Sequence, residues 1–169
     1  MVDLAGKLLV ALPALADGIF DRSVVLLLTA PSESEGPVGV ILNQPTTTEL
    51  GDVLPGWSAW AADPGVVFLG GPCEPEVAIA VSPGGEHGFE TVDLGEEPDG
   101  RPVRVFAGYA GWAPGQLQDE LVRGAWVVVD ARADDATTAQ ASTLWRDVLA
   151  RQGGQLARLS RLPDDPSVN

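Results

Sequence analysis

Few residues in this sequence could serve as a nucleophile or a general base. The chain has one cysteine, Cys73, and one histidine, His87. A Ser–His–Asp or Cys–His catalytic set would have to use His87, and no partner for it is evident in the sequence. Glu74 and Glu76 place negative charge close to the Cys73 thiol, which opposes formation of the reactive thiolate. We interpret Cys73 as a small packing residue in a turn and His87 as a solvated loop residue, and we assign no catalytic residue.

Metal binding and acid–base chemistry also have few candidates. A zinc site made of cysteine and histidine is excluded for a single chain with one of each, and we expect neither a metal nor a cofactor. Carboxylates and amides remain, since catalytic partners are often distant in sequence. Glu120 with Asn43 is the pair that a hydrolase could use. An asparagine at a strand end, however, more often satisfies nearby backbone groups.

A glycine-rich stretch in the second half of the chain would position the carboxylate. Residues 103–107 predict a strand that runs into a turn. Pro114 suits the first position of a helix, and Gly124 suits the position just after one. Residues 125–129 are apolar and β-prone, which predicts a second strand. The connection between the two strands is long enough for a parallel crossover.

The glycine turn before this helix has two interpretations. Unpaired N–H groups where a glycine turn opens a helix can hold an anion. The pattern G-x-x-G-W-x-P-G matches neither phosphate-loop motif, and the acidic charge of the chain disfavours anions. We therefore favour a turn whose glycines allow Tyr109 and Trp112 to pack.

The remaining elements are short and are joined in two different ways. The apolar runs predict strands at residues 8–12, 24–29, 38–42, 66–69 and 77–81, and a helix at 50–54. A second helix is capped by Asp135 or Ser142, runs through the apolar residues of 144–149 and ends at Gly153. Thr46 and Glu49 have the spacing of a capping box before the first helix. The link after residue 69 is too short for a parallel crossover. Residues 82–101 form a long acidic loop that can hold a short hairpin.

These patterns predict an α+β protein built around a mixed sheet with short helices. Without repeats or linkers, we expect one domain over residues 1–162, followed by a polar tail at 163–169.

The charge and cysteine content restrict partners and compartment. Acidic residues outnumber basic ones by 24 to 10, for a net charge of −14. Direct DNA binding would need a local basic patch, and the sequence has none. No apolar run approaches the ~20 residues that span a bilayer. Residues 8–15 fit a strand better than a secretion signal because Pro13 interrupts them. One cysteine fits a reducing compartment, so we expect a cytoplasmic protein.

Three parts of the chain resemble the signature of the YqgE/AlgH family of small bacterial proteins. They are GYAGW at 108–112 with GQL at 115–117, EL at 120–121 and GAW at 124–126; GVILNQP at 39–45; and GGP at 70–72. The resemblance covers most of the chain. It implies a bifurcated sheet that includes a small barrel, with helices around it, and a role in transcriptional regulation. Many family members carry an acidic residue and a histidine where this chain has Thr29 and Ala30, so chemistry assigned to that pair is in doubt here.

Three classes of function remain open. In the first, which we favour, the protein is a non-enzymatic regulatory module that binds a small ligand or a protein. The motif residues would then line one groove: Asn43, Pro45, Gly70, Gly71, Tyr109, Gly111, Trp112, Gln116 and Glu120. The second is the hydrolase described above, and the third is a structural or interaction protein. Exposure separates them, because buried and hydrogen-bonded Tyr109, Trp112 and Asn43 would indicate motifs that only build the fold.

Overall fold

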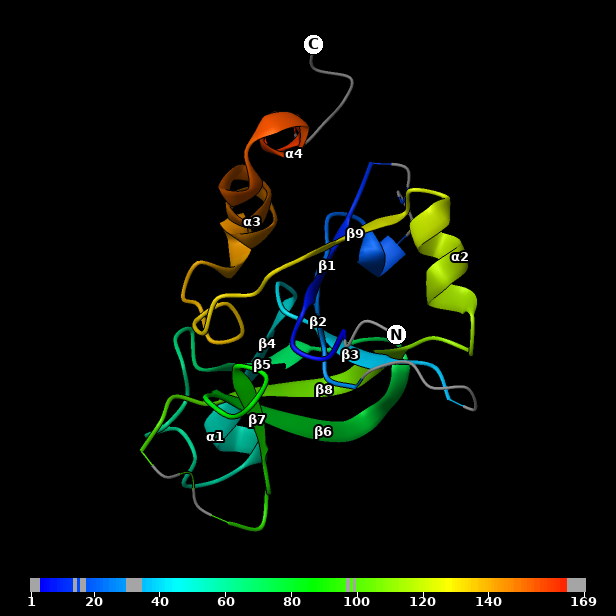
Figure 1. The fold of residues 1–169 in the computed structure, drawn as a ribbon. Coiled ribbons are helices and arrows are strands. Elements are labelled where there is room, and N and C mark those ends of the chain that lie inside the picture. Colours follow the sequence, from blue (N-terminus) through cyan, green and yellow to red (C-terminus); the bar gives the residue numbers. More distant parts are fainter. Residues whose placement is uncertain are drawn as a thin grey trace.

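A computed structural model of the chain describes residues 4–13, 15, 18–29, 35–96, 98 and 100–163. The strands are β1 (Leu8–Ala11), β2 (Val24–Leu27), β3 (Val38–Ile41), β4 (Pro45–Glu49), β5 (Val66–Leu69), β6 (Cys73–Pro83), β7 (Phe89–Val92), β8 (Arg104–Gly111) and β9 (Trp126–Val129). The helices are α1 (Leu50–Val53), α2 (Gln116–Val122), α3 (Leu144–Gln152) and α4 (Gly154–Leu159), with 3-10 turns η1 (Gly18–Phe20) and η2 (Ala141–Thr143) (Figure 1). In this part of the chain no helix has the length and apolar character needed to cross a membrane.

The nine strands of the described chain form one mixed sheet that branches at β8. The main path is β4-β5-β8-β3-β2-β1-β9, and β6 and β7 lie off it. At Phe106 and Ala107, β8 pairs with β5 in parallel and with β6 antiparallel. At Ala110 and Gly111 it pairs with β3. The predicted α+β fold with a mixed, bifurcated sheet is therefore confirmed.

The sheet does not close. Its path begins at β4 and ends at β9, so the small barrel that the family resemblance implies is not formed as a closed barrel by the described strands. The predicted domain limits of 1–162 and the tail at 163–169 stay predictions, and residues 164–169 lie outside the described part.

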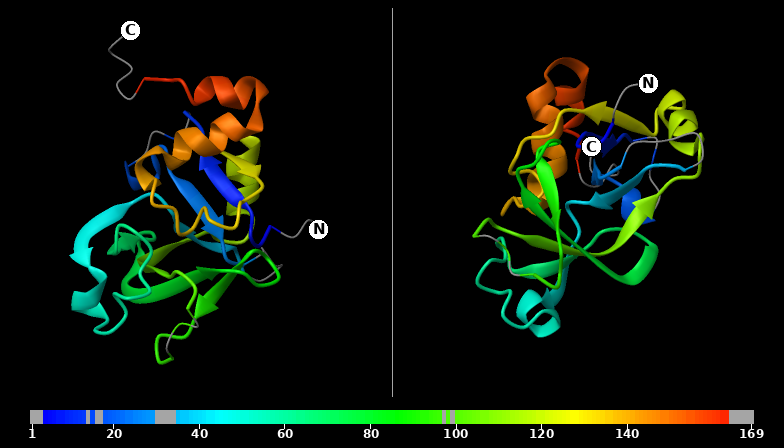
Figure 2. Two further views of the ribbon diagram at one scale, coloured as in Figure 1. Left: turned by 90° about the vertical axis from the view of Figure 1, so that its left-hand side faces the viewer. Right: turned by 60° about the horizontal axis from the view of Figure 1, so that its bottom comes forward.

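β1 and β2 are buried on both faces, as their continuous apolar sequence predicts. Leu8 and Val10 belong to a core that includes α3, whereas Leu9 belongs to a second core that includes Leu117 of α2. Figures 1 and 2 show α3 and α4 on one side of these strands and α2 on the other. Because β1 pairs with both β2 and β9, it lies at the centre of this layered region.

One predicted capping box is wrong. Thr46 and Glu49 lie in β4, where Pro45 pairs with Phe68 and Glu49 with Val66 across a register shift. The Thr46 hydroxyl donates to the carbonyl of Val67 instead of capping a helix. β-branched threonines favour strands, and pairing with β5 outweighs the local capping signal. The predicted hairpin in the acidic loop is confirmed, because β7 pairs with the end of β6.

A buried arginine joins two loops beneath the sheet. Arg104 is 1% exposed and its guanidinium lies 4.1 Å from the ring centroid of Phe68. It donates to the carbonyls of Ala136 and Thr138 on one side and to those of Ala62 and Asp63 on the other. Burial, partly offset by the charge of Asp63, lowers the pKa of Arg104 to about 10, so the side chain remains charged at neutral pH.

Candidate functional site

α2 is the element that carries most of the candidate site. The sequence predicts Pro114 as its first residue, but the helix begins at Gln116. Gly115 takes a left-handed φ of 82° before it, and the Gln116 side-chain oxygen accepts the N–H of Ala113 at 3.0 Å. The predicted end is confirmed, since Gly124 follows the helix with φ 79°. Leu117, fully buried, anchors α2 to the core.

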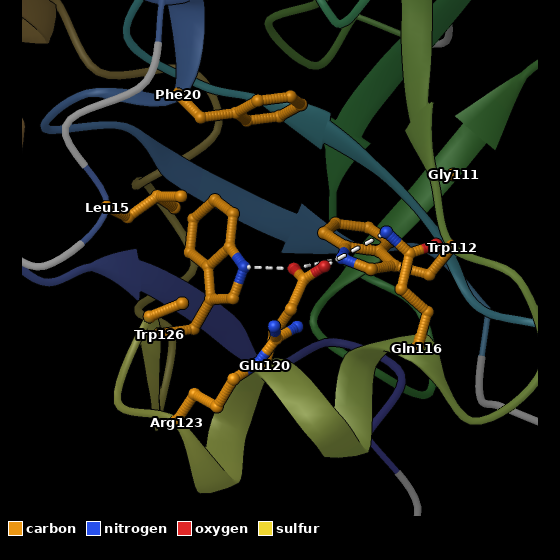
Figure 3. A pocket seen from close by; sticks show the side chains of 9 residues that line it. Leu15, Phe20, Gly111, Trp112, Gln116, Glu120, Arg123 and Trp126 are labelled. Carbon is orange, nitrogen blue, oxygen red and sulfur yellow. Dashed lines mark hydrogen bonds between the residues drawn. The ribbon is translucent and has the colours of Figure 1, made fainter.

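Glu120 is the centre of a polar cluster on α2. Its Oε1 accepts the indole N–H of Trp112 at 3.1 Å and that of Trp126 at 2.9 Å. Its Oε2 accepts from Nε2 of Gln116, one helical turn earlier, at 2.9 Å. Figure 3 shows the carboxylate between the two indoles. Three uncharged donors, from the turn after β8, from α2 and from β9, therefore converge on one half-buried carboxylate.

Three aromatic rings lie around this carboxylate. The rings of Trp112 and Trp126 have centroids 6.1 Å apart at an interplanar angle of 75°, and those of Phe20 and Trp126 are 5.8 Å apart at 83°. Edge-to-face packing of this kind stabilises the arrangement by about 0.5–1.5 kcal/mol per pair. The rings help to enclose a pocket of about 410 Å³. Its lining consists of Leu15, Phe20, Gly111, Trp112, Gln116, Glu120, Arg123, Ala125 and Trp126.

The charge of Glu120 is not neutralised within the described residues, where no ion pair joins it to a cation. Arg123 is the cationic residue in the lining, but its Nε donates to the carbonyl of Asp119, 3.4 Å away. Groups of three or more metal-ligating side chains are also absent from the described residues. The pocket thus offers three aromatic rings and a carboxylate.

The structure brings together four of the nine residues predicted for the site: Gly111, Trp112, Gln116 and Glu120. Asn43 lies apart from the pocket lining. Its side-chain oxygen accepts the N–H of Val24 and its amide donates to the carbonyl of Arg22, both at 3.0 Å. Gln44 likewise donates to the carbonyl of Ile19. The two amides hold the segment that carries Phe20, so their effect on the pocket is indirect.

Gly70 and Gly71 also lie outside the pocket lining, at a close approach of two backbone segments. A Cβ atom on Gly70 would lie 2.3 Å from the carbonyl oxygen of Gly108, and one on Gly71 would lie 2.1 Å from the carbonyl carbon of Tyr109. These glycines let the chain pass from β5 to β6 close against β8. Their role in the fold is steric. Pro45, in β4, is likewise not part of the pocket lining.

Tyr109 is half-buried on β8 and is not in the pocket lining. It pairs with Cys73 in the register of β6 and β8, and its hydroxyl donates to Oε2 of Glu74 at 2.9 Å. That hydrogen bond, with smaller contributions from desolvation and the charge of Glu74, raises the pKa of the Tyr109 hydroxyl above its ordinary value of 10.0. The phenol therefore has a fixed partner away from the carboxylate cluster.

Comparison with known proteins decides the family. The model of the AlgH-like family matches residues 8–157 of this chain.

The chain belongs to the AlgH-like family.

A UPF0301 protein of Streptomyces avermitilis is 48% identical over 186 residues, covering 98% of this chain and 95% of the relative. One from Thermobifida fusca is 41% identical over 192 residues, covering 99% and 96%. The crystal structure of a Corynebacterium diphtheriae protein, 29% identical, has a TM-score of 0.86 and covers 95% of this chain and 93% of its own. The solution structure of AlgH from Pseudomonas aeruginosa shares the fold, with 24% identity, a TM-score of 0.69 and coverage of 97% and 96%.

Part of the pocket of this AlgH-like chain does not follow from the sequence patterns. Trp126 belongs to a family-like segment, but the predicted site does not include its indole. Phe20 and Leu15 come from the distant segment before β2. One signal was available for Trp126. It lies six residues after Glu120, directly beyond the glycine that ends α2, so the chain turns back at that point. No comparable signal connects Phe20 to α2.

Proposed function

We propose that this AlgH-like protein is a non-enzymatic binding module, and that the pocket between η1, α2 and β9 holds a small ligand or a side chain of a protein partner. The observation that carries the proposal is Glu120. Its carboxylate is fixed by two indoles and an amide, yet it has no ion-pair partner among the described residues. Fixed polar groups beside aromatic side chains in a pocket are typical of a binding site.

The size of the pocket supports binding of a compact ligand. Its volume of about 410 Å³ falls within the range of about 300–1,000 Å³ that is usual for small-molecule sites. The buried and hydrogen-bonded indoles of Trp112 and Trp126 favour affinity, because such side chains lose little freedom when a ligand enters.

Regulation by such a module would be indirect. The net charge of −14 opposes contact with the phosphate backbone of DNA. An effect on transcription would therefore pass through a bound ligand or a protein partner. We place this activity in the cytoplasm, where one free cysteine is compatible with the reducing conditions.

The other two classes of function have less support. Asn43 uses both ends of its amide on backbone groups and does not line the pocket with Glu120, so the pair considered for a hydrolase is not assembled. A purely structural role fits Asn43, Gly70 and Gly71 well. It also fits the indole N–H of Trp112, which is bonded in a residue only 8% exposed. It leaves the un-neutralised carboxylate beside a pocket unexplained.

A thermal-shift screen against metabolites and nucleotides tests the proposal. A compound present at 100 times its dissociation constant adds about 2.7 kcal/mol to the unfolding free energy. We expect a hit that raises Tm of the wild type and loses this effect in Glu120→Gln. The matched control is Glu76→Gln, which removes one charge from an exposed position outside the lining and should keep the shift. Hits that act equally on all three proteins would place the ligand elsewhere, and a complete absence of hits would favour a structural role.

A further inference from the structure

We infer, resting on the proposed binding function, that the pocket selects an organic cation: a primary ammonium or guanidinium group placed against the carboxylate of Glu120 and the rings of Trp112 and Trp126. The inference goes beyond binding as such because it specifies the charge of the ligand.

The hydrogen-bond count at Glu120 leaves room for one more donor. An ionised carboxylate has about four acceptor positions. Three are filled, two on Oε1 by the indoles and one on Oε2 by Gln116. The remaining acceptor position belongs to Oε2, and an N–H from a ligand would complete the shell. A cationic donor would also supply the charge that none of the three present donors provides.

The aromatic walls favour the same chemistry. Trp112 and Phe20 both stand nearly perpendicular to Trp126, at interplanar angles of 75° and 83°, and all three residues belong to the pocket lining. A cation over an aromatic face is attracted by the ring quadrupole, most strongly for tryptophan. An alkylammonium or guanidinium group can contact a ring face and the carboxylate at once because it is compact or flat.

Anions meet the opposite conditions in this pocket. Each indole has one N–H donor, and Glu120 already uses those of Trp112 and Trp126. An anion would meet the Glu120 carboxylate in place of the two indole donors, and the field of a chain with charge −14 repels it further. Arg123 is the group that could oppose this selection. Its Nε is directed to the helix carbonyl of Asp119, and no ion pair joins it to Glu120 within the described residues.

The cation could come from a free amine or from a lysine or arginine side chain of a partner protein, since both present the same group. The volume of about 410 Å³ accepts either. The charge of the chain also promotes encounter with cations of both kinds.

The test is an NMR titration of the indole N–H signals, with those of Trp112 and Trp126 assigned by Trp→Phe variants. The probes are n-butylammonium, its neutral analogue n-butanol, its anionic analogue butyrate, and the capped peptide acetyl-Gly-Lys-Gly-amide. We expect saturable shifts of both signals with n-butylammonium or the peptide, and none with n-butanol or butyrate. Whichever cation binds more tightly identifies the source, free amine or protein side chain.

Three variants test whether the cation affinity depends on the charge of Glu120. Glu120→Gln keeps an oxygen for the two indoles and removes the charge, so it should keep the fold and weaken cation binding by about tenfold or more. Glu76→Gln should leave the affinity unchanged. Arg123→Gln should tighten it, because a cation that competes with the ligand is removed from the pocket lining.

Two outcomes overturn the inference in distinguishable ways. In the first, n-butanol or butyrate shifts the two indole signals while both cations fail to do so. Selection for cations is then wrong, but the proposal of a binding module stands. If butyrate is the ligand, Arg123→Gln should abolish its effect. If neither these probes nor any compound of the thermal-shift screen moves the signals, both proposals fail and the cluster serves the fold alone.

Discussion

Arg104 and Glu120 are both charged side chains held mostly away from water, but their hydrogen-bond partners differ in kind. Arg104 is 1% exposed and donates to main-chain carbonyls of two loops. Glu120 is half-buried, accepts from side chains and borders a pocket. Neither forms a salt bridge among the described residues.

The difference indicates what each charge can do. The partners of Arg104 are main-chain carbonyls of two loops, and its hydrogen bonds connect these loops. We therefore interpret the arginine as a cross-link of the fold. The partners of Glu120 are side chains on elements that the helix and the sheet already fix, so its charge is available to a ligand. A buried charge without a full set of partners lowers the stability of the fold. Of these two side chains, only the Glu120 carboxylate lies beside a pocket where a ligand could supply the missing partner.

The largest change in stability should come from replacing Arg104, the more deeply buried of the two side chains. Arg104→Met keeps the length of the side chain but leaves the carbonyls of two loops without donors. We expect a loss of about 3 kcal/mol or more in the free energy of unfolding, measured by urea denaturation. Arg158→Met, at an exposed position of α4, is the matched control and should change stability by about 0.5 kcal/mol or less. Equal stability of the two variants would show that the loops do not depend on Arg104.

Asn43 tests whether a motif amide belongs to the fold or to the ligand. Asn43→Ala removes the acceptor for the N–H of Val24 and the donor to Arg22, so it should destabilise the protein by about 2 kcal/mol. Gln44→Ala removes one hydrogen bond and should cost about half as much. Urea unfolding curves of both variants measure this. A stable Asn43→Ala protein that has lost ligand binding would instead give Asn43 a direct part in the site.

Glu120 should respond differently to loss of its charge and to loss of its acceptors. Glu120→Ala leaves the N–H groups of Trp112 and Trp126 unpaired in residues 8% and 4% exposed, which we expect to cost about 1–2 kcal/mol. Glu120→Gln retains an acceptor oxygen and should cost less than about 1 kcal/mol. Thermal and urea unfolding of the two variants are the measurements. If Gln destabilises as much as Ala, the charge itself stabilises the cluster.

The smallest effect concerns Tyr109, whose partner is neither loop backbone nor pocket. It is the one tyrosine of the chain, so its ionisation can be followed alone by ultraviolet absorbance. Its pKa is raised above 10.0, chiefly by the hydrogen bond to Glu74, so Glu74→Gln should lower it. With a raised folded-state pKa, the stabilising contribution is complete below pH 10 and is lost as the pH rises through the folded-state value. An unchanged pKa in Glu74→Gln would exclude the carboxylate as the cause.

The sequence is sufficient to predict those strands and helices whose residue pattern depends only on burial. The apolar run at residues 24–28 predicts a strand covered on both faces, and β2 is one. Thr46 and Glu49 predict a helix start because local capping signals are visible in a sequence, whereas pairing with β5 is not. The family resemblance implies a branched sheet but not that the branch lies at β8, since no periodicity specifies which edge a strand uses.

The candidate site was predictable only where its members are close in sequence. Trp112, Gln116 and Glu120 lie within one turn and one helix, so their proximity follows from the spacing. Phe20 reaches the pocket because β1 and β9 pair and because Asn43 and Gln44 hold the segment before β2. Asn43 is predicted as a site residue because its residue type indicates which hydrogen bonds it can form. The residue type does not indicate which groups lie near it in the folded chain.

The pairing of β1 with β9 has a consequence for the order in which the chain folds. Leu8 lies opposite Val129, and Ala11 opposite Trp126. A ribosome must therefore make most of the chain before the second edge of β1 has a partner, and until then a wholly apolar strand is open on one side. Contacts so distant in sequence slow folding to about the millisecond-to-second range. The same open edge is the site where an incomplete chain would aggregate or engage a chaperone.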